Sequence, residues 1–446
     1  MKTMEKLHRT YQQVFGKNDP ESELFAPYRV CPLGAHVDHQ HGLVTGFAID
    51  KGIRFVFSPT SSGEIDVVSL DFEGRVTFNL HYPIDTKSHH WGDYLRAAVS
   101  ALQQDFHLER GVRAVVRGEL PVGGLSSSAA LLCGFVVCLS STNEFSLDKR
   151  QVIHYASIAE RQYIGLNNGL LDQSCVVLCQ KNKLLFMDTA TTSYQTLSFG
   201  IKRNTSPMIT TIGNQLPFKI GIFFSGVTRR LVNTNYNQRV DECHSVAWMI
   251  QALEQRPKTP TEKTFLRDIP EDLFLKWYDH LPLHLSRRAL HFYGECQRVV
   301  DATNCWEQGD ITTFGKLMDE SCNSSIHLYE CGSAELTTLW TICRQCDGIY
   351  GGRFAGAGFK GAYIALVDPL FEKEIRNMVT AHYLKRFPEH AETFRIFFCD
   401  VAEGMMPDQQ TYYLQKYGID NTSSRICHKD VSTNSIFPKT IAAVGA

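Results

Sequence analysis

The sequence predicts a two-domain protein that mixes α-helices and β-strands. Its 446 residues exceed what a single hydrophobic core usually organises, so two domains of comparable size are expected. Short alternating apolar segments, typical of strands, are interspersed with longer segments of helical period. A composition shift at residues 202–217, rich in Asn, Thr, Ser and Pro, marks the expected junction. We therefore predict domains at residues 1–210 and 211–420, and a loosely held tail at 421–446.

Hydrophobic periodicity assigns the elements in order. The first half opens with an amphipathic helix near residues 4–14 and continues with strands at 26–31, 43–49, 53–57, 65–70, 75–80 and 112–117, and helices at 91–106, 129–139 and 148–165. The second half begins with a strand at 218–224, followed by helices near 231–254, 271–281, 285–308, 312–328, 334–344 and 371–384, and strands at 349–354, 362–367 and 396–400.

The composition narrows the class of protein. A hydrophobic share of 43% and a charged share of 21% indicate a globular protein, and a net charge of -2 gives no reason to expect nucleic acid or an anionic membrane as partner. The polar start lacks the apolar centre of a signal peptide, and the longest apolar run, 129–139, is too short to span a bilayer. The fourteen cysteines lie mostly in apolar patterns, as buried reduced thiols do. We expect a cytoplasmic protein.

A glycine- and serine-rich loop precedes the apolar helix at 129–139. Its sequence is Pro121-Val-Gly-Gly-Leu-Ser-Ser-Ser-Ala-Ala130. The glycines let the backbone fold closely around a ligand, and the unpaired N–H groups of the helix start favour an anion. An ordinary serine cap is the alternative, but one serine would suffice for it. The loop does not match the Walker A pattern. We predict a nucleotide-phosphate loop made of Gly123, Gly124, Leu125, Ser126, Ser127, Ser128 and Ala129.

A polar loop at residues 32–42 follows the strand that carries Arg29. Its histidines and carboxylate stand in the order His36-x-Asp38-His39-x-His41. Imidazole and carboxylate groups could hold a metal, but the helical spacing H-E-x-x-H is missing. A loop dense in donors and acceptors suits a polyhydroxylated ligand equally well, and we favour a sugar.

Two carboxylates in the first half are candidates for chemistry. Asp172 lies in Gly169-Leu-Leu-Asp-Gln173 among apolar residues, where it is either a helix cap or a placed acid or base. Glu160, near the end of the preceding helix, favours the second interpretation, because a magnesium-nucleotide site without a Walker loop needs carboxylates of its own.

A late glycine-rich stretch, Gly356-Ala-Gly-Phe-Lys-Gly361, matches the dinucleotide pattern G-x-G-x-x-G. A strand is predicted to follow it, so a pyrophosphate would meet no helix start. We reject an oxidoreductase and expect no nicotinamide binding. A glycine-rich bend between two strands, brought close to another part of the site, is the better interpretation.

Three segments together resemble the signatures of the GHMP small-molecule kinase superfamily. Residues 29–42 resemble the galactokinase signature, residues 124–130 the phosphate loop, and residues 351–361 the late glycine-rich motif, in the same order. The likeness runs from about residue 28 to 402. Tyr28-Arg-Val-Cys-Pro-Leu-Gly-Ala-His-Val-Asp-His-Gln40 and Gly165-Leu-Asn-Asn-Gly-Leu-Leu-Asp-Gln-Ser174 look closest to galacturonokinases, which are sugar-acid 1-kinases.

The resemblance implies an α+β, two-domain GHMP kinase fold with the active site in the interdomain cleft. It also implies ATP as co-substrate and Mg²⁺ as cofactor. Asp172 matches the catalytic aspartate, and Arg29 the arginine that holds the reacting hydroxyl and phosphoryl group. Ser128 and Glu160 match the metal ligands, and Trp91 and Tyr94 the adenine pocket. His36, Asp38 and Tyr236 match sugar contacts, and Gly358 of the late motif is expected beside the substrate.

One departure from the galactokinase pattern concerns the substrate. Galactokinases carry a glutamate directly before the motif histidine, where it accepts a hydrogen bond from the sugar 6-hydroxyl; here that residue is Ala35. A glutamate would repel a C6 carboxylate, and alanine removes the charge and makes room. We therefore predict D-galacturonate as substrate, with Arg229 and Arg230 as candidate partners of its carboxylate. The alternatives are a kinase for galactose or another neutral sugar, and a sugar sensor without catalysis.

Overall fold

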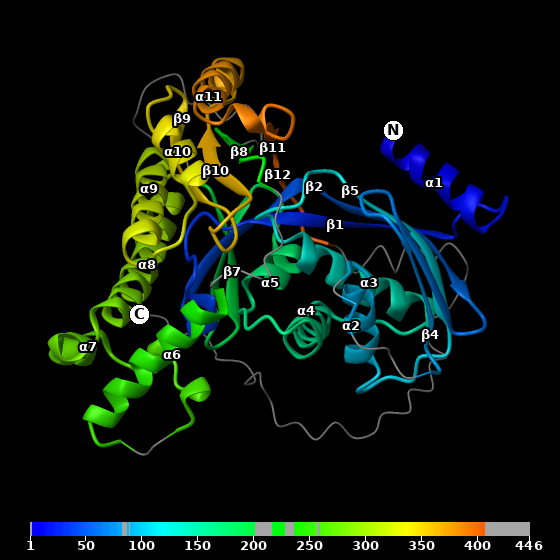
Figure 1. Ribbon diagram of the computed structural model, residues 1–446, viewed down its shortest axis with the longest axis horizontal. Helices are drawn as coiled ribbons and strands as arrows, with labels where there is room; N and C mark the ends of the chain where they lie inside the picture. Colours follow the sequence, from blue (N-terminus) through cyan, green and yellow to red (C-terminus); the bar gives the residue numbers. More distant parts are fainter. Residues whose placement is uncertain are drawn as a thin grey trace.

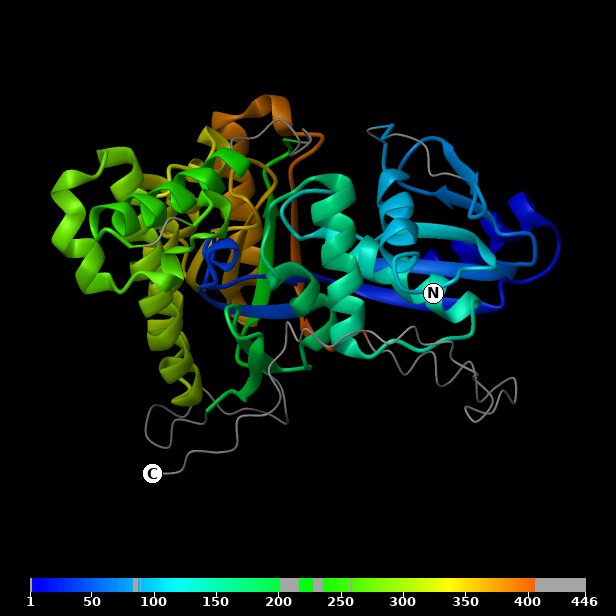
Figure 2. The same cartoon turned by 90° about the horizontal axis from the view of Figure 1, so that it is seen from below.

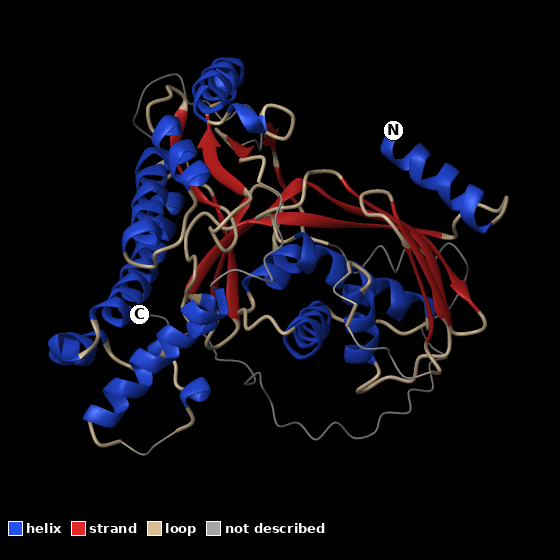
Figure 3. Ribbon diagram, in the orientation of Figure 1, coloured by secondary structure: helices blue, strands red, loops and turns tan. Residues whose placement is uncertain are grey.

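The computed structural model describes residues 2–82, 87–88, 90–200, 216–227, 236–256 and 259–405. Two sheets organise these residues, and helices pack against both of them (Figure 1, Figure 3). The fold is α+β, as predicted. Most of the predicted junction at 202–217 and all of the predicted tail at 421–446 lie outside the described residues.

The first sheet has eight strands built around β2. Its path is β4-β3-β5-β2-β6-β7, and β1 and β12 also pair with β2. All pairings are antiparallel except that of β3 with β5. The strands are β1 Ser22–Val30, β2 Leu43–Thr60, β3 Glu64–Ser69, β4 Arg75–Asn79, β5 Gly111–Gly118, β6 Lys183–Asp188, β7 Ser193–Ser198 and β12 Val401–Ala402.

Strand β2 is one element where the sequence predicted two. The predicted strands at 43–49 and 53–57 are joined, because the extended chain continues through the residues between them. Gly52 makes this possible, since a Cβ at that position would lie 2.2 Å from the carbonyl oxygen of Ala26 in β1. The register of β1 against β2 shifts at the same place, between Pro27 and Arg29. This irregularity positions Arg29, which the site uses.

Helices α2 to α5 lie on one face of the first sheet, and α1 lies on the other (Figure 1). Helix α3 begins directly after the predicted phosphate loop. It is apolar on all sides and almost wholly buried, as a central helix must be. The helices are α1 Lys2–Phe15, α2 Asp93–Leu102, α3 Ser127–Thr142, α4 Lys149–Ile158 and α5 Leu171–Leu178, and a π-helical turn, η2 Ala159–Ile164, follows α4.

The second sheet is antiparallel with the order β11-β8-β10-β9. Helices α8 and α9 form the long pair that stands beside it (Figure 1, Figure 2). The strands are β8 Lys219–Phe224, β9 Ile349–Phe354, β10 Ala362–Val367 and β11 Arg395–Cys399. The helices are α6 Tyr236–Leu253, α7 Glu271–Trp277, α8 Leu283–Glu307, α9 Ile311–His327, α10 Ala334–Cys343 and α11 Glu372–Arg386.

The two sheets share one hydrophobic core. The rings of Phe47 in β2, Phe218 before β8 and Trp306 in α8 lie within 6.2 Å of one another, centroid to centroid. After β11 the chain returns to the first sheet, where Val401 pairs with Ile49 of β2. The halves are therefore fixed against each other by packing and by backbone pairing.

Two further expectations can be compared with the structure. Of the thirteen cysteines that the structure describes, eleven are buried, in keeping with the apolar patterns in which the sequence places them. Within the described ranges, no helix has both the length and the apolar character needed to cross a membrane.

Candidate active site

Arg29 and Asp172 form the centre of the site. Arg29 lies near the end of β1, and its Nε and Nη2 each lie 2.7 Å from Oδ1 of Asp172 at the start of α5. The guanidinium is 4% exposed and the carboxylate 21%, so the carboxylate alone has an open side. Two N–H groups on one carboxylate oxygen fix the direction in which Asp172 faces. The sequence predicted this pair as catalytic, and the structure brings it together.

The phosphate loop adjoins this pair directly. Arg29 also donates from Nη1 to the carbonyl oxygen of Gly124 at 3.0 Å, and its backbone N–H donates to the carbonyl oxygen of Leu125. Ser126 has left-handed backbone angles (φ 51°, ψ 48°) at the start of α3, and its hydroxyl donates to Oδ2 of Asp172. Asp172 therefore lies at the free N-terminus of α3, where anions are stabilised.

The late glycine motif packs against the phosphate loop. It forms the bend between β9 and β10, as predicted. A Cβ at Gly356 (φ +62°) would lie 3.0 Å from Cα of Gly124, and one at Gly361 (φ +98°) would lie 2.8 Å from the carbonyl carbon of Gly123. Only glycines allow these two backbones to approach so closely. The second half of the chain thereby sets the position of the loop.

Glu160 is held by three neutral donors. Asn168 and Gln173 donate to its Oε2, the former at 2.8 Å, and Ser128 also hydrogen-bonds to the carboxylate. The π-helical turn η2 carries Glu160 inward. Burial, together with the nearby charge of Asp172, raises the pKa of Glu160 to about 7. The group therefore has a strong tendency to bind a proton or a cation.

The residues around Glu160 fit a nucleotide-bound Mg²⁺. Among the described residues no group of three or more His, Cys, Asp and Glu side chains could hold a metal by itself. Mg²⁺ typically takes one or two carboxylates and obtains its other oxygens from substrate phosphates and water. One carboxylate and one hydroxyl, Glu160 and Ser128, suit that requirement beside a phosphate loop.

The loop at residues 31–42 is anchored by helix α8. Glu295 accepts from the backbone N–H groups of Gly34 and Ala35 through its Oε1, at 2.8 and 3.1 Å. His291, one turn earlier, donates from Nε2 to the carbonyl oxygen of Ala35 at 3.0 Å. Both peptide groups flanking Ala35 are thus fixed, and its methyl group occupies a defined place in the loop.

The histidines around this loop are neutral. Burial is the main cause in each case: it lowers the pKa of His36, lowers that of His39 to about 3 and lowers that of His291 to about 4. Nε2 of His36 lies 3.6 Å from Sγ of Cys331, and the carbonyl oxygen of Ser325 lies within reach of the same thiol. In the tautomer in which Nε2 donates to this sulfur, Nδ1 of His36 is left as an acceptor for a hydroxyl group.

Asp38 begins the short helix η1, Asp38–Gln40. Its Oδ2 accepts weakly from the backbone N–H of Leu171, the residue before Asp172, and Gly169 packs directly against the carboxylate. Burial and the charge of Asp172 raise the pKa of Asp38 to about 6. The loop thus brings a second carboxylate close to the first.

Tyr329 connects the predicted sugar residues to one another. Its ring stacks on His36 with centroids 4.2 Å apart, and its hydroxyl bonds to Nε2 of His39 at 3.1 Å. Tyr236, at the start of α6, meets His39 edge to face at 6.2 Å. The structure therefore brings His36 and Tyr236 to the same place, as the sequence predicted.

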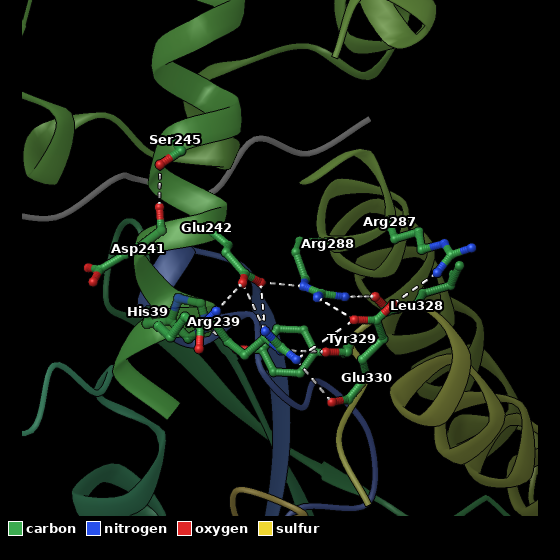
Figure 4. Close-up of polar contacts among 11 residues, drawn as sticks. His39, Arg239, Asp241, Glu242, Ser245, Arg287, Arg288, Leu328, Tyr329 and Glu330 are labelled. Carbon is green, nitrogen blue, oxygen red and sulfur yellow. Dashed lines mark hydrogen bonds and ion pairs between the residues drawn. The ribbon is translucent and has the colours of Figure 1, made fainter. Parts of the chain in front are cut away.

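An ion-pair network holds Tyr329 in position (Figure 4). Arg239 donates to the carbonyl oxygen of Tyr329 at 3.0 Å, and Arg288 donates to that of Leu328. Glu242 and Glu330 balance the two arginines, since each carboxylate contacts both guanidinium groups. The network joins α6, α8 and the segment after α9.

The remaining predicted residues have different outcomes. Gly358 (φ +71°) lies against Cys331, since a Cβ there would be 2.9 Å from its sulfur, so it is close to His36. Trp91 is buried before α2, and Tyr94 packs against the core; their place in an adenine pocket stays a prediction. Arg229 and Arg230 lie outside the described residues.

Sequence reasoning missed Glu295, His291 and Tyr329. A signal for the first two was present, since both stand on the apolar stripe of α8, where an uncompensated charge is expensive. Tyr329 carried no such signal, because an aromatic residue after a helix is ordinary core material.

Comparisons with known proteins define the class. The GHMP kinases N terminal domain model matches residues 93–180, and the GHMP kinases C terminal model matches residues 301–385. The chain is 33% identical to the galacturonokinase of Arabidopsis thaliana over 416 residues, which cover 88% of this chain and 95% of that protein. The chain belongs to the GHMP kinase family, whose members transfer a phosphoryl group to an alcohol.

Other relatives extend this result to structure. The galactokinase of Staphylococcus carnosus is 29% identical over 399 residues, covering 86% of this chain and 95% of that one. The crystal structure of Lactococcus lactis galactokinase complexed with galactose superposes with a TM-score of 0.79 at 24% identity, covering 91% of this chain and all of that one. A mevalonate kinase from Methanococcus jannaschii superposes with a TM-score of 0.59 at 16% identity, covering 85% and 98%. The structural likeness supports the fold.

Proposed function

We propose that the protein is an ATP-dependent sugar-acid 1-kinase. It phosphorylates D-galacturonate at the anomeric hydroxyl and gives α-D-galacturonate 1-phosphate and ADP. The observation that carries the substrate is Ala35, which stands where the galactokinase motif has a glutamate and whose flanking peptides are fixed by Glu295 and His291. The 33% identity to a galacturonokinase supports the same substrate.

Asp172 acts as the base or orienting group for the C1 hydroxyl. The hydroxyl proton passes to the open side of the carboxylate, the C1 oxygen forms a bond to the γ-phosphorus, and the bond from that phosphorus to the β,γ-bridging oxygen breaks, leaving ADP. Arg29 holds Oδ1 of Asp172, and the hydroxyl of Ser126 holds Oδ2. Arg29 thus links the base to the phosphate loop through Gly124.

Positioning and charge neutralisation contribute most to phosphoryl transfer. The loop from Gly123 to Ala129 and the start of α3 would bind the ATP phosphates through backbone N–H groups. Ser128 and Glu160 would hold Mg²⁺. When bound, the cation neutralises charge on the transferred phosphoryl group and on the leaving oxygen. Trp91 and Tyr94 remain our proposal for the adenine side.

The sugar binds along the loop at residues 31–42. His36 would accept from a hydroxyl through Nδ1, and Asp38, Tyr236 and Gly358 would line the same side. The partners of the reaction are ATP and a sugar acid, without nucleic acid or membrane, and the location is cytoplasmic. Domains at residues 1–210 and 211–420 are part of the same proposal.

A sugar panel tests this proposal. The purified chain is incubated with ATP, Mg²⁺ and one of galacturonate, glucuronate, galactose or arabinose, and ADP release and the sugar 1-phosphate are both measured. We expect galacturonate to be phosphorylated on C1 and to have the highest kcat/KM of the four sugars. A higher kcat/KM for galactose than for galacturonate would show that the protein is a neutral-sugar kinase. The similarity to the galactokinase of Staphylococcus carnosus supports this alternative. Binding of sugar and ATP without ADP release would establish the sensor.

A further inference from the structure

A buried cluster of three charged side chains lies directly behind Ala35. We call Glu295 and Arg298 of α8 and Arg353 of β9 the Glu295 cluster. Nε of Arg298 lies 2.9 Å from Oε2 of Glu295, and Nη1 of Arg353 lies 3.8 Å from Oε1. Glu295 and Arg353 are fully buried, and the side chain of Arg298 is 16% exposed.

The cluster carries a net positive charge of one. Two guanidinium groups face a single carboxylate, and the pKa of Glu295 is about 2, because Arg298 and Arg353 outweigh the opposing effect of burial. The neighbouring His291 and His36 are neutral. Within the described residues, Nε and Nη1 of Arg353 and Nη2 of Arg298 are buried without a hydrogen-bond partner. Such an uncompensated buried cation is costly and favours a nearby anion.

The cluster touches the sugar loop through Oε1 of Glu295. That oxygen accepts from the N–H groups of Gly34 and Ala35 and from the hydroxyl of Ser321 at 2.7 Å. The carboxylate of Glu295 therefore links the two guanidinium groups to the backbone of residue 35. In galactokinases a glutamate at this position would supply the negative charge; Ala35 does not.

We propose that the Glu295 cluster selects an anionic sugar by its net charge, with the substrate's C6 carboxylate beside Ala35 as the counter-charge. This inference rests on the proposed function. Because Arg353 is fully buried, the cluster acts through its electric field and not through a direct contact. At about 8 Å and an effective dielectric constant of about 20, one unit of charge changes the affinity for a carboxylate roughly thirtyfold.

A charge series at constant size tests the inference. Arg298→Gln makes the cluster neutral, the unchanged protein has a charge of one, and Glu295→Gln raises it to two while keeping an oxygen for the N–H groups of Gly34 and Ala35. The measured quantity is kcat/KM for galacturonate divided by that for galactose. If galactose is not turned over, the dissociation constants of galacturonate and of its methyl ester are measured by calorimetry instead. Their ratio compares a charged with an uncharged sugar in the same way.

We expect the ratio to fall at least tenfold in Arg298→Gln and to rise at least tenfold in Glu295→Gln. Loosening of the loop would lower the use of both sugars in both variants, so opposite changes are specific to charge. Arg344→Gln is the matched control: it removes a guanidinium 3.8 Å from Asp319 in the same half of the chain and should leave the ratio unchanged. Should Glu295→Gln fail to fold, Arg298→Gln and the ester comparison still decide.

The outcomes separate the two proposals. A protein that phosphorylates galacturonate but whose ratio is flat across the series, or moves against the charge, keeps the proposed function and overturns this inference. An unchanged protein that neither binds nor phosphorylates galacturonate overturns both.

Discussion

Replacing Asp172 by asparagine probes the centre of the site with the smallest change in shape. The substitution removes the negative charge and the proton acceptor, while the amide oxygen can still accept from Arg29. Loss of a positioned base costs about 10² to 10⁴ in rate. Since Asp172 also fixes Arg29 and Ser126, we expect kcat to fall by about 10³ or more.

The same substitution has a predictable effect on stability. Arg29 is 4% exposed, and breaking a buried ion pair costs about 3 to 5 kcal/mol. Because the amide still contacts Arg29, we expect Asp172→Asn to lower the free energy of unfolding by about 3 kcal/mol, the lower end of this range. At about 2.1 cal/mol/K per residue, unfolding 446 residues has an entropy of about 0.9 kcal/mol/K, so the melting temperature should fall by about 3 °C.

The assay measures steady-state ADP release, ATP binding by calorimetry and melting by scanning calorimetry. ATP affinity should stay within about threefold, because the loop N–H groups and Glu160 are unchanged. Asp66→Asn is the matched control: it also breaks an Arg–Asp pair, with Arg75, but in the hairpin of β3 and β4 away from the site. An Asp172→Asn protein with a kcat within tenfold of the unchanged protein would refute the role of Asp172.

Four further predictions concern single elements of the site. Ala35→Glu should lower kcat/KM for galacturonate at least tenfold and leave KM for ATP unchanged, because two carboxylates would share one place; an unchanged galacturonate KM would contradict the placement of C6. Asp38→Asn should raise KM for the sugar, and it should raise the melting temperature at pH 8 but not at pH 4. The pKa of Asp38 is about 6 in the folded protein and 3.8 for a free side chain, so the unchanged protein loses stability as the pH rises between these values and asparagine avoids that loss. Equal shifts at both pH values would reject that reasoning. Glu160→Gln should raise the Mg²⁺ concentration needed for half-maximal rate at least tenfold, measured with Mg²⁺ titrations at saturating ATP, and an unchanged requirement would move the cation elsewhere. Gly356→Ala should raise KM for ATP severalfold with little effect on KM for the sugar, since its Cβ would meet Gly124, whereas Gly16→Ala, also at positive φ (+110°) but with nothing within 4 Å of the added Cβ, should be kinetically silent.

The elements of the site that could be predicted from the sequence are local ones. A loop with paired glycines and three serines before an apolar run predicts a helix start with free donors, because the helix start and the donors are consecutive residues. The late glycine motif also needed only its neighbours, since a strand on each side excludes a dinucleotide helix. The Arg29–Asp172 pair, 143 residues apart, came from resemblance and not from any local pattern.

The rest depends on contacts between distant segments. Gly52 lies between two predicted strands, yet it allows β2 to continue past a bulge in β1, and only the approach of Ala26 explains it. Glu295 contacts a loop 260 residues earlier in the chain. Charged residues on the buried stripe of a helix can be recognised in a sequence, but the partner that compensates them cannot.

The proposed phosphate side and the proposed sugar side of the site differ in their electrostatics. On the proposed phosphate side, charged groups lie together: the guanidinium of Arg29, the start of α3 and the carboxylate of Glu160, which suits a cation. On the sugar side, His36, His39 and His291 are all neutral, so their ring nitrogens can recognise hydroxyl groups but cannot distinguish a carboxylate by attraction. Among the groups that the structure describes, we therefore assign selection for an acidic sugar to a fixed charge behind these rings. Among the described residues that contact the loop at Ala35, the Glu295 cluster is the group with an unbalanced positive charge.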